Sequence, residues 1–101
     1  MTQMAVFVGV CRVELDLEGN DSLKGKRSVV KSLIHRVQNQ FNASIAEVDA
    51  NDEHGRAVLG VAVVGNDKRF VNACVDKIRD FMEREADAPV ADFQFSIEQF
   101  D

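Results

Sequence analysis

Residues 56–64 read RAVLGVAVV, a run in which apolar side chains fill both sets of alternating positions. A strand with one solvated face alternates apolar and polar residues, whereas a strand covered on both faces is apolar almost throughout. This segment therefore predicts a strand at the centre of a sheet. The polar stretch before it, residues 51–55 (NDEHG), predicts a turn in which Gly55 takes a positive φ angle.

Outward from this strand, three further segments have the spacing of strands and two have the spacing of helices. The predicted strands are residues 4–17, 43–50 and 90–100. The predicted helices are residues 22–40, capped by Asp21 or Ser22, and a second helix that follows residue 67 and ends near residue 86, before Pro89. The resulting order is βαββαβ over a single domain, residues 1–101.

Two split βαβ units with right-handed crossovers form a ferredoxin-like α+β sandwich. In that fold the antiparallel sheet has the strand order 4-1-3-2, and both helices lie on one face. The side chains that face the helices from the central strands then form the core. These inward residues are Phe7, Cys11, Val13, Leu59, Val61 and Val63. The second helix is expected to face the core with a stripe of Phe70, Cys74, Ile78 and Phe81, flanked by Val71, Val75 and Met82.

The opposite face of the central strands is too apolar for a solvated sheet. Its residues are Val6, Val8, Val10, Val58, Ala62 and Val64. An apolar patch of several hundred Å² usually marks an interaction surface. We therefore expect a homodimer in which a second copy covers this open sheet face. A different protein partner, or a loop or tail of the same chain, is the alternative.

Residues 21–30 (DSLKGKRSVV) place cations where a helix start disfavours them. The 20 residues from 21 to 40 carry a local charge of +4 in a chain whose net charge is −5. Free N–H groups at a helix start favour anions, and lysine or arginine adds charge-assisted bonds to phosphate. We therefore predict an anion or RNA-phosphate site formed by Lys24, Lys26, Arg27 and Lys31, with Gly25 permitting close backbone approach. Lys26 lies at the edge of the apolar stripe and is expected to extend outward. The alternative is a solvated flank.

The same residue types argue against several classes of protein. The acidic total argues against a general nucleic-acid coat, so no DNA partner is expected. No apolar run approaches the roughly 18 residues that span a bilayer, and the N-terminus lacks the features of a signal peptide, so no membrane contact is expected. The two cysteines fit no metal or redox spacing, and we expect them buried and reduced. Glu47, Asp49 and His54 lack a fourth ligand, so no metal and no cofactor are expected.

The segments SLKGKRSVVKSL, FNASIAEV and RAVLGVAVVGND together resemble the YlxP-like family of small bacterial proteins. The resemblance spans nearly the whole chain and implies a ferredoxin-like fold in a cytoplasmic protein. Members of this family are often encoded beside translation initiation and ribosome maturation factors, which associates the family with ribosome biogenesis. The resemblance implies no established activity. In the hairpin, residues 52–55 (DEHG) stand where the family often has an aromatic residue.

These observations favour a non-enzymatic accessory protein, since no nucleophile–histidine pair, phosphate loop or dinucleotide fingerprint occurs. It is expected to bind ribosomal RNA or a ribosomal subunit through the basic start of the first helix. The alternative is a dimeric regulatory module that binds an anionic metabolite at the same helix start. A structural adaptor that uses the apolar sheet face is a third possibility.

Overall fold

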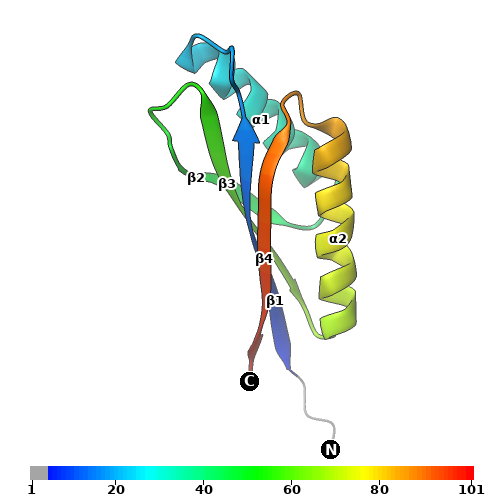
Figure 1. Cartoon of the computed structure of the whole chain (residues 1–101). Coiled ribbons are helices and arrows are strands. Elements are labelled where there is room, and N and C mark those ends of the chain that lie inside the picture. Colours follow the sequence, from blue (N-terminus) through cyan, green and yellow to red (C-terminus); the bar gives the residue numbers. More distant parts are fainter. Residues whose placement is uncertain (1–4) are drawn as a thin grey trace, which may run out of the picture.

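A computed structural model describes residues 5–101 as a four-stranded antiparallel sheet with two helices on one face (Figure 1). The elements are β1 (Val6–Asp16), α1 (Leu23–Gln40), β2 (Ser44–Asp49), β3 (Arg56–Gly65), α2 (Lys68–Glu85) and β4 (Val90–Phe100). The strand order β2-β3-β1-β4 is the predicted order. The ferredoxin-like α+β fold is therefore confirmed. Met4, the predicted first residue of the opening strand, lies outside the described residues.

Three long strands determine the shape of the molecule. β1 pairs with β4 from Val6 opposite Phe100 to Leu15 opposite Val90, with one irregularity after Glu14. β1 pairs with β3 without interruption from Phe7 opposite Gly65 to Asp16 opposite Arg56. β2 is shorter and forms one edge of the sheet. The fold is consequently elongated, with extents of 58 × 21 × 18 Å.

The core lies between the helices and the inward face of β1 and β3, as the alternation predicts. Five of the six expected strand residues belong to it, whereas Phe7 is only partly buried and lies outside the core cluster. α1 adds three buried side chains to this cluster: Val30, Leu33 and Val37. Each fully buried aliphatic side chain contributes about 1.5–3 kcal/mol by leaving water, so this layer is the main source of stability.

The stripe by which α2 packs on the sheet is displaced from its predicted centre toward the predicted flank. The buried residues are Val71, Val75, Ile78 and Met82, whereas Phe70 is 57% exposed. Two glycines account for this shift. A Cβ atom on Gly9 would lie 2.9 Å from both Val71 Cγ1 and Val75 Cγ2, and one on Gly65 would lie 2.9 Å from Val71 Cγ2. The missing side chains let the valines approach the sheet, and the exposed Phe70 ring lies beside Gly65, where a Cβ atom would be 3.2 Å from Phe70 Cδ2.

The open sheet face is less uniform than predicted. Val6, Val10 and Val64 are 43%, 46% and 65% exposed, and Val8 and Ala62 are partly buried. Val58 is wholly buried, so its predicted place on a partner face is wrong. Its cross-strand neighbours are Glu14 and Asp49, whose longer side chains flank it. Exposed apolar area therefore extends from one end of the sheet, where Phe100 is 71% exposed, to its middle, where Val48 lies over Gly60 and is 57% exposed.

Candidate anion-binding site

The start of α1 is closed by a polar loop of the same chain. Ser22 is the N-cap, and its hydroxyl oxygen accepts a hydrogen bond from Gly25 N at 3.0 Å, as one of the two predicted caps. Asn20 Nδ2 donates to the carbonyl oxygens of Ser22 and His54, each at 2.7 Å. A Cβ atom on Gly25 would lie 2.4 Å from Asn20 Oδ1. Gly25 thus makes room for Asn20, and the expected approach of an anion to this glycine is wrong.

Lys26 does not extend outward; its side chain is only 1% exposed. Its ammonium group donates to the carbonyl oxygens of Ala50 and Glu53, the latter at 2.7 Å. The ammonium also lies 2.8 Å from Glu47 Oε2. This contact is an ion pair rather than an aligned hydrogen bond, because Oε2 is buried and accepts no hydrogen bond. Lys26 is therefore removed from the predicted anion site by internal partners.

The Lys26 contacts fasten the β2–β3 hairpin to the first turn of α1. Within the hairpin the positive φ angle, 59°, falls on Ala50 and not on Gly55 as predicted. The carbonyl group of this strained residue is one of the Lys26 acceptors. His54 Nδ1 lies 3.1 Å from Asn20 O and adds a second link between the two loops. Hydrogen bonds from the buried lysine hold this turn with the positive φ angle at Ala50, where a glycine would have adopted that angle without strain.

Arg56 organises a second polar cluster, on the open sheet face beside the hairpin. Its guanidinium group bonds to Glu53 Oε2 at 2.6 Å and to Glu14 Oε1 at 2.8 Å. The hydrogen bond that Arg56 donates to Glu53 and the charges of Glu53 and Glu14 raise the pKa of Arg56 above its ordinary value. Because Glu53 and Glu14 already pair with Arg56, this arginine is not free to bind an external anion.

The other three predicted cations remain available on the surface. Lys24, Arg27 and Lys31 are exposed on one flank of α1. Within residues 5–101 none of the three forms an ion pair. His35 continues the same flank and is also exposed. We call Lys24, Arg27, Lys31 and His35 the basic flank.

An open groove of about 490 Å³ runs beside this flank. Arg27, Lys31 and His35 border it, and Val30 and Ile34 contribute its apolar surface. Glu47 lines the side toward the edge strand β2, where the Lys26 ammonium balances its charge. The groove therefore combines cations with an apolar surface, an arrangement that suits a ligand with both a phosphate and a planar or aliphatic part.

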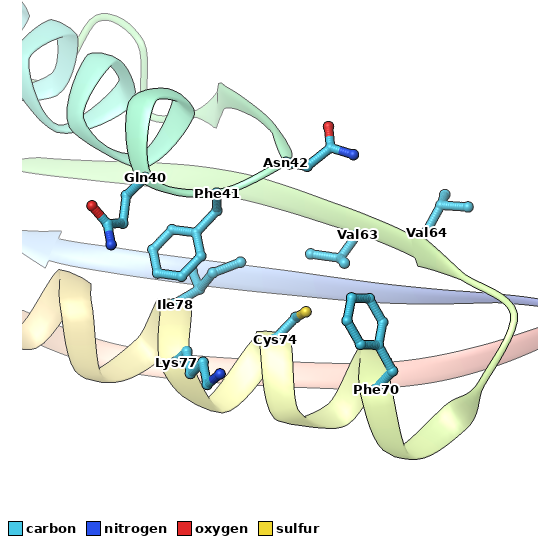
Figure 2. A pocket seen from close by; sticks show the side chains of 9 residues that line it. All are labelled: Gln40, Phe41, Asn42, Val63, Val64, Phe70, Cys74, Lys77 and Ile78. Carbon is cyan, nitrogen blue, oxygen red and sulfur yellow. The ribbon is translucent and has the colours of Figure 1, made fainter.

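A second pocket, of about 360 Å³, lies at the other end of α1, where the helix meets α2 and β3 (Figure 2). Phe41, Val63, Phe70 and Ile78 form most of its apolar wall. The sulfur atom of Cys74 points from α2 toward Val63 (Figure 2). The sequence patterns did not indicate this pocket, because it depends on where α1 ends relative to α2.

Both cysteines are free, as expected, but their environments differ. Cys11 is buried beneath the helices, and this burial raises the pKa of its thiol to about 11. Cys74 is only partly buried, because it borders the second pocket. Between residues 5 and 101, no group of three or more histidine, cysteine, aspartate or glutamate side chains is placed to hold a metal ion. Neither α1 nor α2 is long and apolar enough to cross a membrane.

The fold and the basic flank define a small ferredoxin-like domain with one cationic helix surface. Residues 8–95 match the family described as "Protein of unknown function (DUF503)". The chain is also 38% identical over 77 residues to the uncharacterized protein YlxP of Bacillus subtilis (strain 168), an alignment that covers 76% of this chain and 84% of that protein. The chain belongs to this YlxP-like family, as its sequence segments indicated, and the family description states no activity.

Solved structures share the architecture at low sequence identity. Protein SO0527 from Shewanella oneidensis superposes with a TM-score of 0.51 at 18% identity, covering 98% of this chain and 93% of that one. The Bacillus subtilis YXEP protein, a dinuclear metal binding peptidase from the M20 family, gives a TM-score of 0.54 at 17% identity, covering 99% of this chain and 28% of that one. At such identities these likenesses establish the fold alone.

The segments that carry the family resemblance meet in space at the buried ion pair. Lys26 belongs to SLKGKR and Glu47 to FNASIAEV, and the two side chains are in contact. Two sequence features could have predicted this pair. One is a lysine at the border of an apolar helical stripe, and the other is a glutamate in a short edge strand. The angle of Lys26 around the helix axis assigned it to the surface, because that angle carries no information about hydrogen-bond acceptors on another strand or loop.

Proposed function

We propose that this protein binds RNA of a ribosomal particle through the basic flank of α1, as a non-enzymatic accessory factor. The observation that carries the proposal is a set of exposed cations, Lys24, Arg27 and Lys31, that have no ion-pair partner among residues 5–101 and lie along one helix of an acidic chain. A cation that no internal acid neutralises can release counterions from a phosphate backbone, which is the main source of RNA affinity. The acidic remainder of the chain would orient the flank toward the RNA.

The groove beside the flank supports contact with a single-stranded or looped segment. Phosphates would lie at Arg27 and Lys31, and the apolar surface of Val30 and Ile34 would accept the face of an unstacked base. Three neutralised phosphates predict a salt dependence of about −2 in log K against log salt, since each single-strand contact contributes about −0.7. RNA binding that depends on three phosphate contacts is weak and should be lost at high salt.

The test is co-sedimentation of the native chain with ribosomal subunits at low and high salt. In the first variant, Lys24→Glu, Arg27→Glu and Lys31→Glu reverse the flank. The matched control reverses three exposed, unpaired cations elsewhere: Arg12→Glu, Lys68→Glu and Arg69→Glu. Both variants change the net charge equally, and circular dichroism verifies their fold. We expect salt-sensitive binding that the flank variant loses and the control variant largely retains.

Equal loss in both variants would indicate non-specific attraction, and undiminished binding by the flank variant would refute the proposal. A second candidate is a dimeric regulatory module that binds an anionic metabolite in the same groove. The groove volume of about 490 Å³, which is within the range of small-molecule sites, favours this candidate. Saturable thermal stabilisation by a small phosphate compound, lost in the flank variant, would support it over RNA binding.

A further inference from the structure

The pocket at the end of α1 has a shape suited to a small molecule. Its volume of about 360 Å³ is more than twice that of the roughly 150 Å³ apolar cavity that accepts benzene in an engineered protein. It forms where β2 begins, since Ser44 pairs with Ala62 and no further β2 residue pairs with the end of β3. Val63 and the residues after it therefore form a wall that the sheet leaves uncovered on that side.

Apolar side chains form one part of the wall of this pocket, and polar groups contribute at least as much of its exposed lining. Phe41 is held in place by an edge-to-face contact with Phe81, with ring centroids 5.4 Å apart. Ile78 is fully buried and forms the inner surface, and the exposed Phe70 ring provides the opposite end. An aliphatic or aromatic ligand of modest size would remove apolar surface from water here, which favours its binding.

Two of the polar side chains, Lys77 and Gln40, lie at one end of the pocket, and Asn42 borders it nearer to Val63 and Val64 (Figure 2). Lys77 borders it from α2, and Gln40 borders it from the last turn of α1, both beside Phe41 and Ile78 (Figure 2). Lys77 is exposed and, in the part of the chain that the structure describes, takes part in no ion pair. Lys77 and Gln40 also border a smaller depression together with Asp80 and Arg84. One ammonium group and one amide therefore adjoin one end of a partly open pocket.

We propose that this pocket binds a small amphipathic monocarboxylate, with its apolar part between Phe41, Val63 and Phe70 and its carboxylate at Lys77 and Gln40. The site is independent of the basic flank, because it lies at the opposite end of α1 and shares no lining residue with the groove. A carboxylate is favoured over a phosphate because a single lysine is present, whereas phosphate recognition usually recruits several donors.

Cys74 provides a native reporter for occupancy. Its thiol borders the pocket, whereas Cys11 is buried with its pKa raised to about 11 and will not compete for an alkylating reagent near neutral pH. We would measure the rate of Cys74 alkylation by iodoacetamide with increasing octanoate, below the concentration at which octanoate forms micelles. Amide shifts in a ¹⁵N-labelled sample would locate the binding. 1-Octanol and acetate serve as probes of the tail and the head group alone.

Octanoate is expected to slow Cys74 alkylation saturably and to shift amides around the pocket, whereas acetate has no effect. Lys77→Gln should weaken octanoate binding about two- to fivefold, the usual range for a solvent-accessible ion pair, and leave 1-octanol unchanged. Lys68→Gln removes the same charge from the same helix but outside the pocket, so it should change neither octanoate binding nor 1-octanol binding. Cys74→Phe fills the pocket from α2 and should abolish the amide shifts.

Three results would overturn the proposal. The first is an alkylation rate and a set of amide shifts that do not respond to octanoate. The second is equal binding of octanoate and 1-octanol together with no effect of Lys77→Gln, which would make the pocket a non-specific apolar depression. The third is protection of Cys74 that rises with protein concentration alone and accompanies a dimer mass, which would make a second copy the occupant. The native chain and Lys77→Gln together decide among these even if Cys74→Phe does not fold.

Discussion

Replacing the buried lysine by methionine, Lys26→Met, should remove a large part of the stability of this domain. The substitution keeps the aliphatic volume and deletes the ammonium group. Glu47 Oε2 then loses its close cation, and the carbonyl groups of Ala50 and Glu53 lose their donor. Removing one partner of a buried ion pair typically costs about 3–5 kcal/mol. A domain of this size has a total stability of about 5–15 kcal/mol.

The neighbouring carboxylate should matter less than the lysine. Glu47→Gln leaves Lys26 with two backbone acceptors, so we expect a loss of about 1–2 kcal/mol. Lys26→Met combined with Glu47→Leu removes both charges, and this double variant should be more stable than Lys26→Met alone because no uncompensated carboxylate remains. Lys31→Met, an exposed lysine on the same helix, should change stability by less than about 0.5 kcal/mol.

Chemical denaturation followed by circular dichroism measures these differences directly. In a thermal melt, the loss for Lys26→Met should lower the midpoint by more than about 12 °C, since a domain of this size shifts by about 4–8 °C per kcal/mol. The reasoning is refuted if Lys26→Met costs no more than Lys31→Met. It is also refuted if Glu47→Gln proves as damaging as Lys26→Met, because the backbone carbonyl bonds would then contribute nothing.

Three further predictions concern packing and pH. Gly25→Ala should destabilise by about 1 kcal/mol despite the better helix propensity of alanine, because Asn20 must give up two hydrogen bonds, and the loss should shrink in an Asn20→Ala background. Gly9→Ala should cost about 1–3 kcal/mol in denaturant melts, since its Cβ would overlap the buried Val71 side chain, and an unchanged midpoint would contradict the close packing of α2. The raised Cys11 pKa, about 11 against 9.0, implies that the unfolded chain ionises first, so stability should fall between pH 9 and 11. Cys11→Ala should remove this part of the pH dependence, and an unaltered pH profile would show that other groups cause the fall.

The alternation of apolar residues was sufficient to predict the secondary structure and its arrangement. Residues 56–64 are apolar in both phases, which assigned β3 to the centre, and the βαββαβ order then allowed one common sheet topology. The helix ends also followed from local chemistry, as the Ser22 cap and the end of α2 before Pro89 illustrate. These features depend on contacts between residues that are close in sequence.

The candidate site was predicted only in part. The sequence identified the concentration of cations after Ser22 and suggested a surface at which they act. Lys24, Arg27 and Lys31 are exposed as such a surface requires, and their binding role stays a prediction. Lys26 was assigned to the same set because helical angle and charge do not distinguish a solvated lysine from one that meets acceptors on a distant hairpin.

The sequence by itself determined the order of elements, the strand order and the position of the basic helix, because side-chain periodicity and capping act over a few residues. Tertiary structure alone decided which lysine is buried and which residues of α2 face the sheet. It also created the pocket beside Cys74. Lys26 depends on Glu47, Ala50 and Glu53 of the hairpin, and the rotation of α2 depends on two glycines in other strands. Such contacts join residues far apart in the chain, so no local pattern specifies them.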